Sequence, residues 1–124
     1  MNYSITILCD DEHNRTFIAI EEMFRSPMGI ASIKVNEEKR EAYILNILRH
    51  PEYGGCGLTK DLIKHCIRHA EKKSVEKIYC GVYKKRDGLQ ALLLSMGFKQ
   101  TKSDSLNHNR FCLRSHRNAR GVKN

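Results

Sequence analysis

Four segments at the start of the chain are rich in β-branched and aromatic residues, and this pattern predicts four β-strands. The segments are "NYSITILCD", "RTFIAIE", "GIASIKV" and "EAYILNIL". Polar, turn-forming stretches separate them, with "DDEHN" after the first and "NEEKR" between the third and the fourth. Two apolar runs joined by a short charged turn are typical of a β-hairpin, so we expect antiparallel pairing here.

Helical spacing begins after residue 57. Apolar residues recur there every three or four positions, which predicts one buried stripe on a helix. The stripe consists of Leu58, Leu62, Ile63, Cys66, Ile67 and Ala70. A strand "KIYCGVY" and a short helix "LQALLLSM" follow, and we expect Gly97 to cap that helix. "FKQTKSD" and "RFCLRS" predict two closing antiparallel strands.

The order of elements predicts a mixed α/β (α+β) fold within one domain, residues 1–114. A strand–helix–strand crossover makes its two strands parallel, and ligands of such sheets bind at the carboxyl edge of the strands. The last ten residues, 115–124, carry Arg117, Arg120 and Lys123 and no acidic residue. They predict a mobile basic tail.

Composition and charge limit the class of protein and its partners. The chain has 124 residues, of which 40% are hydrophobic and 29% charged, without an apolar run of membrane length or a signal-peptide pattern. Five scattered cysteines without a C-x-x-C pair favour reduced thiols, so we expect a cytoplasmic protein. Residues 1–50 carry six basic and eight acidic side chains, whereas residues 51–124 carry sixteen and six. This asymmetry indicates an anionic ligand or partner for the C-terminal half.

Two histidines, His65 and His69, lie one helical turn apart with Cys66 between them. Cys66 faces away from the pair and the spacing offers no third ligand, so we expect no metal site.

Three glycines, Gly54, Gly55 and Gly57, immediately precede the first helix in "HPEYGGCGLTKDLIKHC". Backbone N–H groups at a helix start have no partner within the helix, and the helix dipole adds positive charge there. Glycines before that start allow the loop to surround a phosphate. The alternative is that these glycines only turn a corner.

Two motifs resemble the GNAT superfamily of N-acetyltransferases. "YILNILRHPEYGGCGLTKDLI", from Tyr43 to Ile63, resembles its acetyl-CoA motif: a strand ending in a proline and an aromatic residue, then Arg/Gln-x-x-Gly-x-Gly/Ala, then a helix. "SMGFKQT" resembles the segment after the second CoA-side helix. The resemblance covers residues 3–114 and implies a mostly antiparallel sheet with one splayed parallel pair and two CoA-side helices. Only five residues separate Cys9 from Arg15, which implies a short variant without the usual two helices and with an open acceptor side.

The resemblance also implies a binding site for acetyl-CoA as cosubstrate, without a metal. The pantetheine arm would pair with the strand before the loop, at Ile47, Leu48 and Arg49. A backbone N–H near Leu48 would stabilise the oxyanion formed during transfer. The pyrophosphate would lie on the loop that follows Gly54, on the amides of Gly55, Cys56, Gly57, Leu58 and Thr59.

The sequence departs from the family pattern at several positions. Gly54 stands where the family has arginine or glutamine, and Thr59 where it has glycine or alanine. Leu93 stands where many members have a tyrosine that protonates the leaving thiolate. The family often places a glutamate base on the strand before the loop, and the nearest candidates here are Glu41 and Tyr43.

Two interpretations of function remain open. The first is an N-acetyltransferase that moves an acetyl group from acetyl-CoA to an amine of a protein or peptide, by direct attack in a ternary complex. The second is a catalytically weak or inactive GNAT-fold module that engages an acidic protein or a nucleic acid through its basic C-terminal half.

Overall fold

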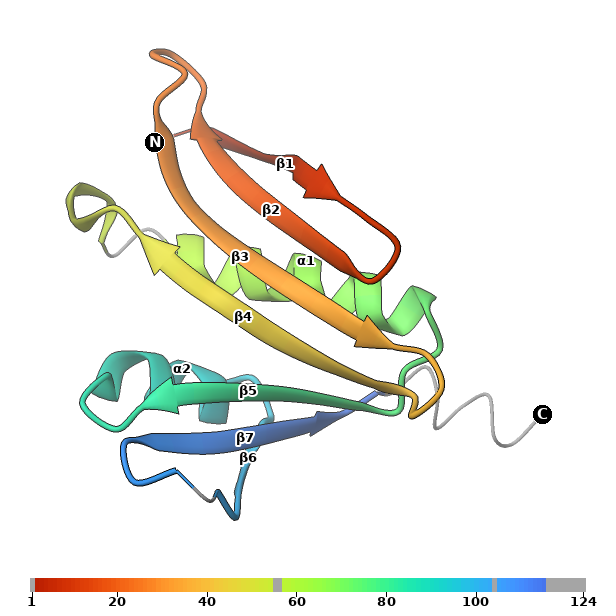
Figure 1. The fold of residues 1–124 in the computed structure, drawn as a ribbon. Coiled ribbons are helices and arrows are strands. Elements are labelled where there is room, and N and C mark those ends of the chain that lie inside the picture. The colour runs from red at the N-terminus through yellow and green to blue at the C-terminus, as the bar shows by residue number, and fades with distance from the viewer. Residues whose placement is uncertain (1, 55–56, 104, 116–124) are drawn as a thin grey trace.

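The computed structural model describes residues 2–54, 57–103 and 105–115, which form a seven-stranded sheet with two α-helices (Figure 1). The strands are β1 (Tyr3–Asp10), β2 (Asn14–Glu21), β3 (Pro27–Asn36), β4 (Glu41–Arg49), β5 (Lys77–Tyr83), β6 (Lys99–Thr101) and β7 (His108–Arg114). The helices are α1 (Leu58–Lys72) and α2 (Asp87–Ser95), and a 3₁₀ turn (Pro51–Tyr53) follows β4. The predicted order of elements and the mixed fold class are confirmed.

The sheet has the strand order β1-β2-β3-β4-β5-β7-β6, and β4 and β5 are its parallel pair. Within residues 2–54, all of which the structure describes, no helix separates β1 from β2. A tight turn joins these strands because the Asp11 carboxylate accepts the backbone N–H groups of His13 (2.9 Å) and Asn14 (2.8 Å). The short connection expected from the sequence is therefore present.

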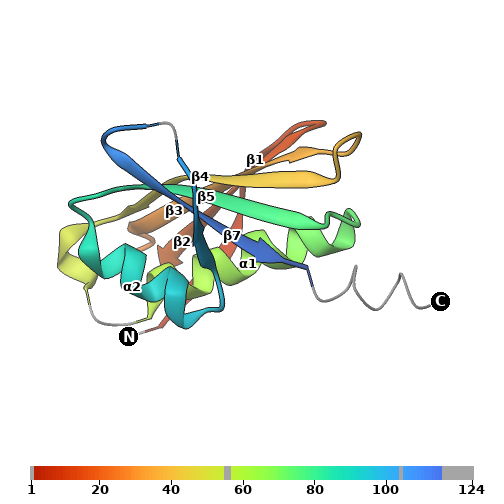
Figure 2. The ribbon, with the colours of Figure 1, turned by 90° about the horizontal axis from the view of Figure 1, so that it is seen from below.

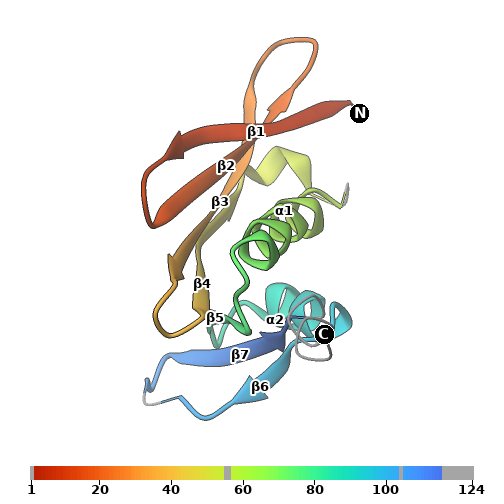
Figure 3. The ribbon, with the colours of Figure 1, turned by 90° about the vertical axis from the view of Figure 1, so that its right-hand side faces the viewer.

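Both helices pack on the same face of the sheet, as Figures 2 and 3 show. The predicted stripe of α1 faces the strands, with Leu58, Leu62, Ile63, Cys66 and Ala70 buried. These side chains meet the inward-facing residues of β2 to β5, which form one hydrophobic core. No helix of the described residues covers the opposite face of the sheet.

Helix α2 ends as the sequence predicts. Gly97 has a φ of 96°, its N–H donates to the Leu94 carbonyl (3.1 Å), and the Phe98 N–H donates to the Leu93 carbonyl (3.0 Å). This pair of bonds is a Schellman motif, and it satisfies carbonyls that the last helical turn leaves without partners. Phe98, the next residue, is buried in the core.

The closing strands differ from the prediction in length. Strand β6 covers only Lys99–Thr101, because its pairing with β7 stops at Thr101–Arg110. Ser115, placed in the tail by the sequence, is buried and donates its N–H to the Glu76 carbonyl at 2.9 Å. The rest of the predicted tail lies outside the described residues.

None of the described helices is both long and apolar enough to cross a membrane.

Candidate active site

Strands β4 and β5 run side by side for only part of their length. Their register extends from Glu41–Lys77 to Ile44–Cys80, and the ribbons then diverge toward their carboxyl ends (Figure 1). The cause lies in β4, where the register with β3 shifts by one residue and Asn46 adopts a φ of 54°. Such a bulge bends a strand and ends its pairing. The splayed parallel pair that the resemblance implied is therefore formed by a bulge that the sequence did not reveal.

Gly29 of β3 allows the end of β4 to lie close to the core. A Cβ at Gly29 would be 2.8 Å from the Leu48 carbonyl oxygen and 3.3 Å from Leu62 Cδ1 of α1. A real Cβ does not approach a backbone oxygen this closely, so only glycine fits here. Leu48 itself is 58% exposed.

The start of α1 has the features of an anion site. Gly57, its N-terminal cap, has a φ of 74°, and no side chain caps the first turn. Among the described residues, and apart from its chain neighbours, nothing lies within 4 Å of the position that a Cβ at Gly57 would take. The N–H groups of Leu58 and Thr59 belong to this uncapped turn. Such free N–H groups at a helix start generally stabilise a phosphate. Gly55 and Cys56, also predicted for this role, lie outside the described residues.

A cavity of about 580 Å³ connects the start of α1 with the start of α2. Thr59 and Arg49 were predicted for this site, whereas Lys85 and Arg86, from the loop before α2, were not. Its lining residues are Arg49, Thr59, Lys85, Arg86, Asp87, Gly88, Leu89 and Leu92. The basic run "KKR" before α2 is the signal that would have indicated Lys85 and Arg86.

The Arg49 side chain lies beside Gly54, the position at which the resembled motif has arginine or glutamine. A Cβ on Gly54 would be 3.5 Å from Arg49 Nη2 and 3.6 Å from its Cζ. The Arg49 guanidinium therefore lies where a side chain at position 54 would begin. Strand β4 thus brings a cation to the loop that the motif normally supplies from the loop itself.

The two candidate base residues are at the other end of β4. Glu41 is the first residue of the strand and Leu48 is seven residues farther along, a separation of roughly 20 Å in extended chain. This is too far for direct proton transfer to a group at Leu48. Tyr43 stacks on Tyr79 instead, with ring centroids 5.3 Å apart. The structure therefore does not bring Glu41 or Tyr43 to Leu48.

Two titratable residues that sequence reasoning missed lie at the carboxyl end of β5. Tyr83 and His108 are register partners on β5 and β7, with ring centroids 4.3 Å apart. Tyr83 is 54% exposed, and His108 Nδ1 lies 3.3 Å from the Ser105 hydroxyl. Leu93, at the position of the family tyrosine, is fully buried in the core. Only the pairing of β5 with β7 reveals the proximity of Tyr83 and His108.

The buried cysteines are not suited to act as nucleophiles. Burial raises the pKa of Cys66 to about 12 and, likewise, that of Cys80 to about 12. Both side chains are in the core, and a thiol must ionise to attack. Among the described residues, no group of three or more histidine, cysteine, aspartate and glutamate residues could hold a metal ion.

Comparisons with known proteins relate this geometry to one family. Residues 2–98 match the model of the acetyltransferase (GNAT) family. No curated protein matches the sequence.

Solved structures show the same fold at low sequence identity. A Klebsiella pneumoniae protein assigned as an acyl-CoA N-acyltransferase is 12% identical with a TM-score of 0.81, over 91% of this chain and 97% of that one. Spermidine N-acetyltransferase from Vibrio cholerae, solved with CoA and spermine, is 18% identical with a TM-score of 0.75, over 88% and 70%. The IAA acetyltransferase from Bacillus cereus is 16% identical with a TM-score of 0.73, over 91% and 99%.

Proposed function

Because this chain belongs to the GNAT family of acetyltransferases, we propose that it transfers an acetyl group from acetyl-CoA to an amine of a protein or peptide. The observation that carries the proposal is the cavity of about 580 Å³ between the first turns of α1 and α2. It is bordered by an uncapped helix start and three cations, Arg49, Lys85 and Arg86. Phosphate groups are stabilised by both features.

The residues of β4 would position the reacting end of the cosubstrate. The bulged segment from Ile47 to Arg49 lies beside the diverging end of β5, so its backbone can pair with an extended pantetheine arm. A backbone N–H near Leu48 would then stabilise the negative charge that develops on the thioester oxygen. We propose Tyr83 and His108 as the groups that move protons here, because they lie at the carboxyl end of β5.

Direct attack by the amine in a ternary complex fits the cysteine chemistry of the chain. Cys66 and Cys80 have raised pKa values and no access from the cavity, since both are buried in the core. Cys9 is exposed on β1, at the far edge of the sheet from β5. Cys112 is partly buried on β7 and Cys56 lies outside the described residues, and we propose that the amine attacks the thioester itself.

A protein or peptide acceptor fits the acceptor side better than a polyamine does. No helix covers the face of the sheet opposite α1 and α2 in the described residues, so a large acceptor can approach. Lys77, Arg110 and Arg114 also lie on that face and would repel a polycation, such as the spermine bound to the Vibrio enzyme, more strongly than a single lysine ammonium group or α-amine. We propose a lysine or α-amine of a macromolecule.

A second function, a module without turnover, is favoured by two observations. Leu93 offers no proton to a leaving thiolate, and Glu41 is distant from Leu48. Such a module would keep the cofactor site but, in place of turnover, would engage an acidic protein or a nucleic acid through its basic C-terminal half.

The purified chain distinguishes them directly. Acetyl-CoA at about one hundred times its dissociation constant should stabilise the fold by about 2.7 kcal/mol, which a thermal melt detects. CoA release in the presence of lysine-containing peptides supports the enzyme, whereas binding without release on any amine supports the module. A melting curve that millimolar acetyl-CoA leaves unchanged contradicts both.

A further inference from the structure

The face of the sheet without helices carries a row of side chains across five strands. The register pairs Lys34 with Tyr43, Tyr43 with Tyr79, Tyr79 with Cys112, and Cys112 with Lys99. Register partners project to the same face, so the row has a lysine at each end and two tyrosines between them. It crosses four strand spacings, or roughly 19 Å.

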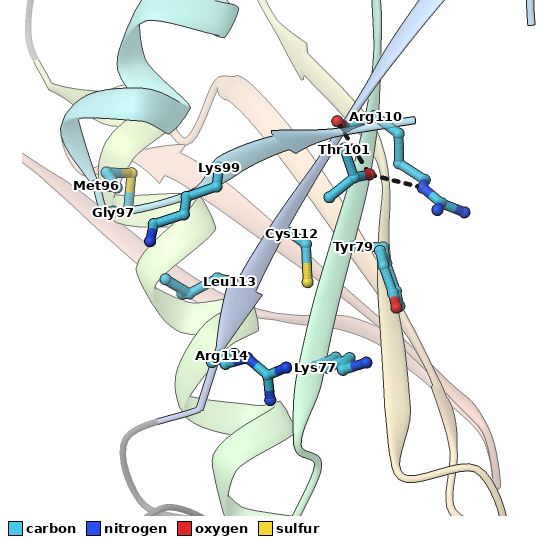
Figure 4. A pocket seen from close by; sticks show the side chains of 10 residues that line it. All are labelled: Lys77, Tyr79, Met96, Gly97, Lys99, Thr101, Arg110, Cys112, Leu113 and Arg114. Carbon is cyan, nitrogen blue, oxygen red and sulfur yellow. Dashed lines mark hydrogen bonds between the residues drawn. The ribbon is translucent and has the colours of Figure 1, made fainter. Parts of the chain in front are cut away.

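The tyrosines in this row form a stack with an arginine. The rings of Tyr43 and Tyr79 are 5.3 Å apart and inclined by only 22°, and Arg110 Cζ lies 5.0 Å from the Tyr79 ring centroid. Arg110 Nε also donates to the Thr101 hydroxyl at 3.0 Å, which holds the guanidinium over the ring (Figure 4). Tyr43 is 37% exposed and Arg110 is exposed. The stack is thus preformed, and both of its ends are accessible.

A cationic cavity of about 550 Å³ lies against this stack. Figure 4 shows Lys77, Lys99, Arg110 and Arg114 arranged around Cys112, and none of the ten lining residues is acidic. Within the described part of the chain, none of these four cations is ion-paired within 4 Å.

The arrangement of these cations opposes folding. Lys77 and Arg114 are direct register partners, and like charges in that position destabilise a sheet. Glu41, which pairs with Lys77 on β4, is the one acidic residue in the same register row. Cations held together at this cost favour an anionic ligand.

We propose that this surface binds single-stranded nucleic acid. We call it the basic stacking surface and define it as Lys34, Tyr43, Lys77, Tyr79, Lys99, Arg110 and Arg114. Single strands are bound by cations that follow the phosphates and by planar groups on which bases stack. Bases stack on the outer faces of Tyr43 and Arg110, and phosphates lie along the lysines. An acidic peptide would use the cations but not the stack.

The proposal concerns a surface outside the cofactor cavity and does not depend on acetyl transfer. The sequence that follows the surface's last strand is also basic. The chain continues from Arg114 into residues that include Arg117, Arg120 and Lys123.

Fluorescence anisotropy of the full chain with a labelled oligothymidylate of about twelve nucleotides tests the proposal. Affinity should fall as salt rises from about 50 to 200 mM, with a slope of about −0.7 for each phosphate contact. Arg110→Gln should weaken binding about fivefold or more and make the slope shallower by about 0.7. Tyr43→Leu should weaken binding to a similar degree and leave the slope unchanged, because stacking releases no counterion.

Control variants distinguish the effect of the basic stacking surface on binding from the effect of the total charge of the chain. Arg68→Gln and Lys64→Gln remove exposed cations of α1 on the helical face and should bind like the parent chain. Tyr43→Phe keeps the ring and should restore binding, and a melting curve of each variant verifies its fold. Equal affinity of Arg110→Gln and the parent overturns the proposal. It is also overturned if polyglutamate competes as well as the unlabelled oligonucleotide, since that result indicates an acidic peptide.

Discussion

Arg86 donates a hydrogen bond from Nη1 to the backbone carbonyl of Ile47 at 3.1 Å, and this bond links the loop after β5 to the bulged end of β4. The carbonyl belongs to the segment of β4 with which the pantetheine arm is proposed to pair. The same guanidinium lines the cavity proposed for the phosphates. In the proposed complex, Arg86 would therefore compete with the pantetheine arm for the Ile47 carbonyl and attract the phosphates.

Arg86→Gln should affect the two parts of the cosubstrate in opposite directions. A charge-assisted hydrogen bond contributes about 1.5–3 kcal/mol, so CoA should bind about tenfold more weakly once the cation is gone. Acetyl-pantetheine, which has no phosphates, should bind as tightly as before or more tightly, because the Ile47 carbonyl is released. Isothermal titration with both ligands measures this difference, and Arg68→Gln is the control. If both ligands weaken equally, Arg86 only supports the loop.

Gly57→Val should abolish CoA binding by blocking the open space before α1. The φ of 74° also adds strain of about 1–2 kcal/mol for a residue with a Cβ. Gly57→Asn separates the two effects, since asparagine tolerates this conformation but still projects a side chain. Denaturation in urea should show a smaller loss of stability for Gly57→Asn, while titration shows weakened CoA binding for both. Normal CoA binding by both variants would mean that the loop is only a structural turn between β4 and α1.

Gly29→Ala should destabilise the fold by about 1–3 kcal/mol, because its Cβ would overlap the Leu48 carbonyl. The strand end must shift to relieve this contact, so CoA binding should weaken as well. Gly81→Ala provides the matched control: it adds the same methyl group to β5 where nothing lies within 4 Å, so the unfolding midpoint should stay at or above that of the parent chain. Equal unfolding midpoints for the two variants would contradict the close approach.

Most of the fold was predictable because its signals are local. The stripe from Leu58 to Ala70 and the cap at Gly97 each depend on residues within a few positions of one another. The bulge at Asn46 was not predicted. Asparagine is uncommon in strands and tolerates a positive φ, but only the pairing with β3 shows that the strand continues past it with a shifted register. Long-range pairing of the strands likewise determines which face of the sheet is left without helices, so local sequence signals could not predict it.

The candidate site was predictable where a motif marks it. Gly57 and Thr59 belong to such a motif. Arg86 comes to the cavity from the loop before α2, and only the pairing of β5 with β7 brings His108 beside Tyr83. Glu41 was selected because it is on the correct strand. Residue type and strand did not indicate that Glu41 lies at the opposite end of the nine-residue β4 from Leu48.

The final prediction concerns the pH dependence of acetyl transfer. A lysine amine with a pKa near ~10.4 is almost wholly protonated at neutral pH, and only its neutral form attacks, so the rate should rise with pH. His108→Gln should lower kcat near neutral pH and matter less as the pH climbs, because a neutral amine needs no base. Glu41→Gln and His13→Gln, which change groups away from Leu48, should follow the parent profile.

The pH range over which this rate can be measured is limited by the stability of the fold at high pH. Burial raises the pKa values of Cys66 and Cys80 to about 12 in the folded chain, because the core disfavours the thiolate. The unfolded chain therefore loses these protons first, and the stability that the buried thiols contribute is complete below about pH 9 and lost as the pH rises toward 12. Circular dichroism at each pH must accompany the rate measurement. If Glu41→Gln lowers kcat at neutral pH while His108→Gln does not, protons are handled at the other end of β4, and the assignment to Tyr83 and His108 is wrong.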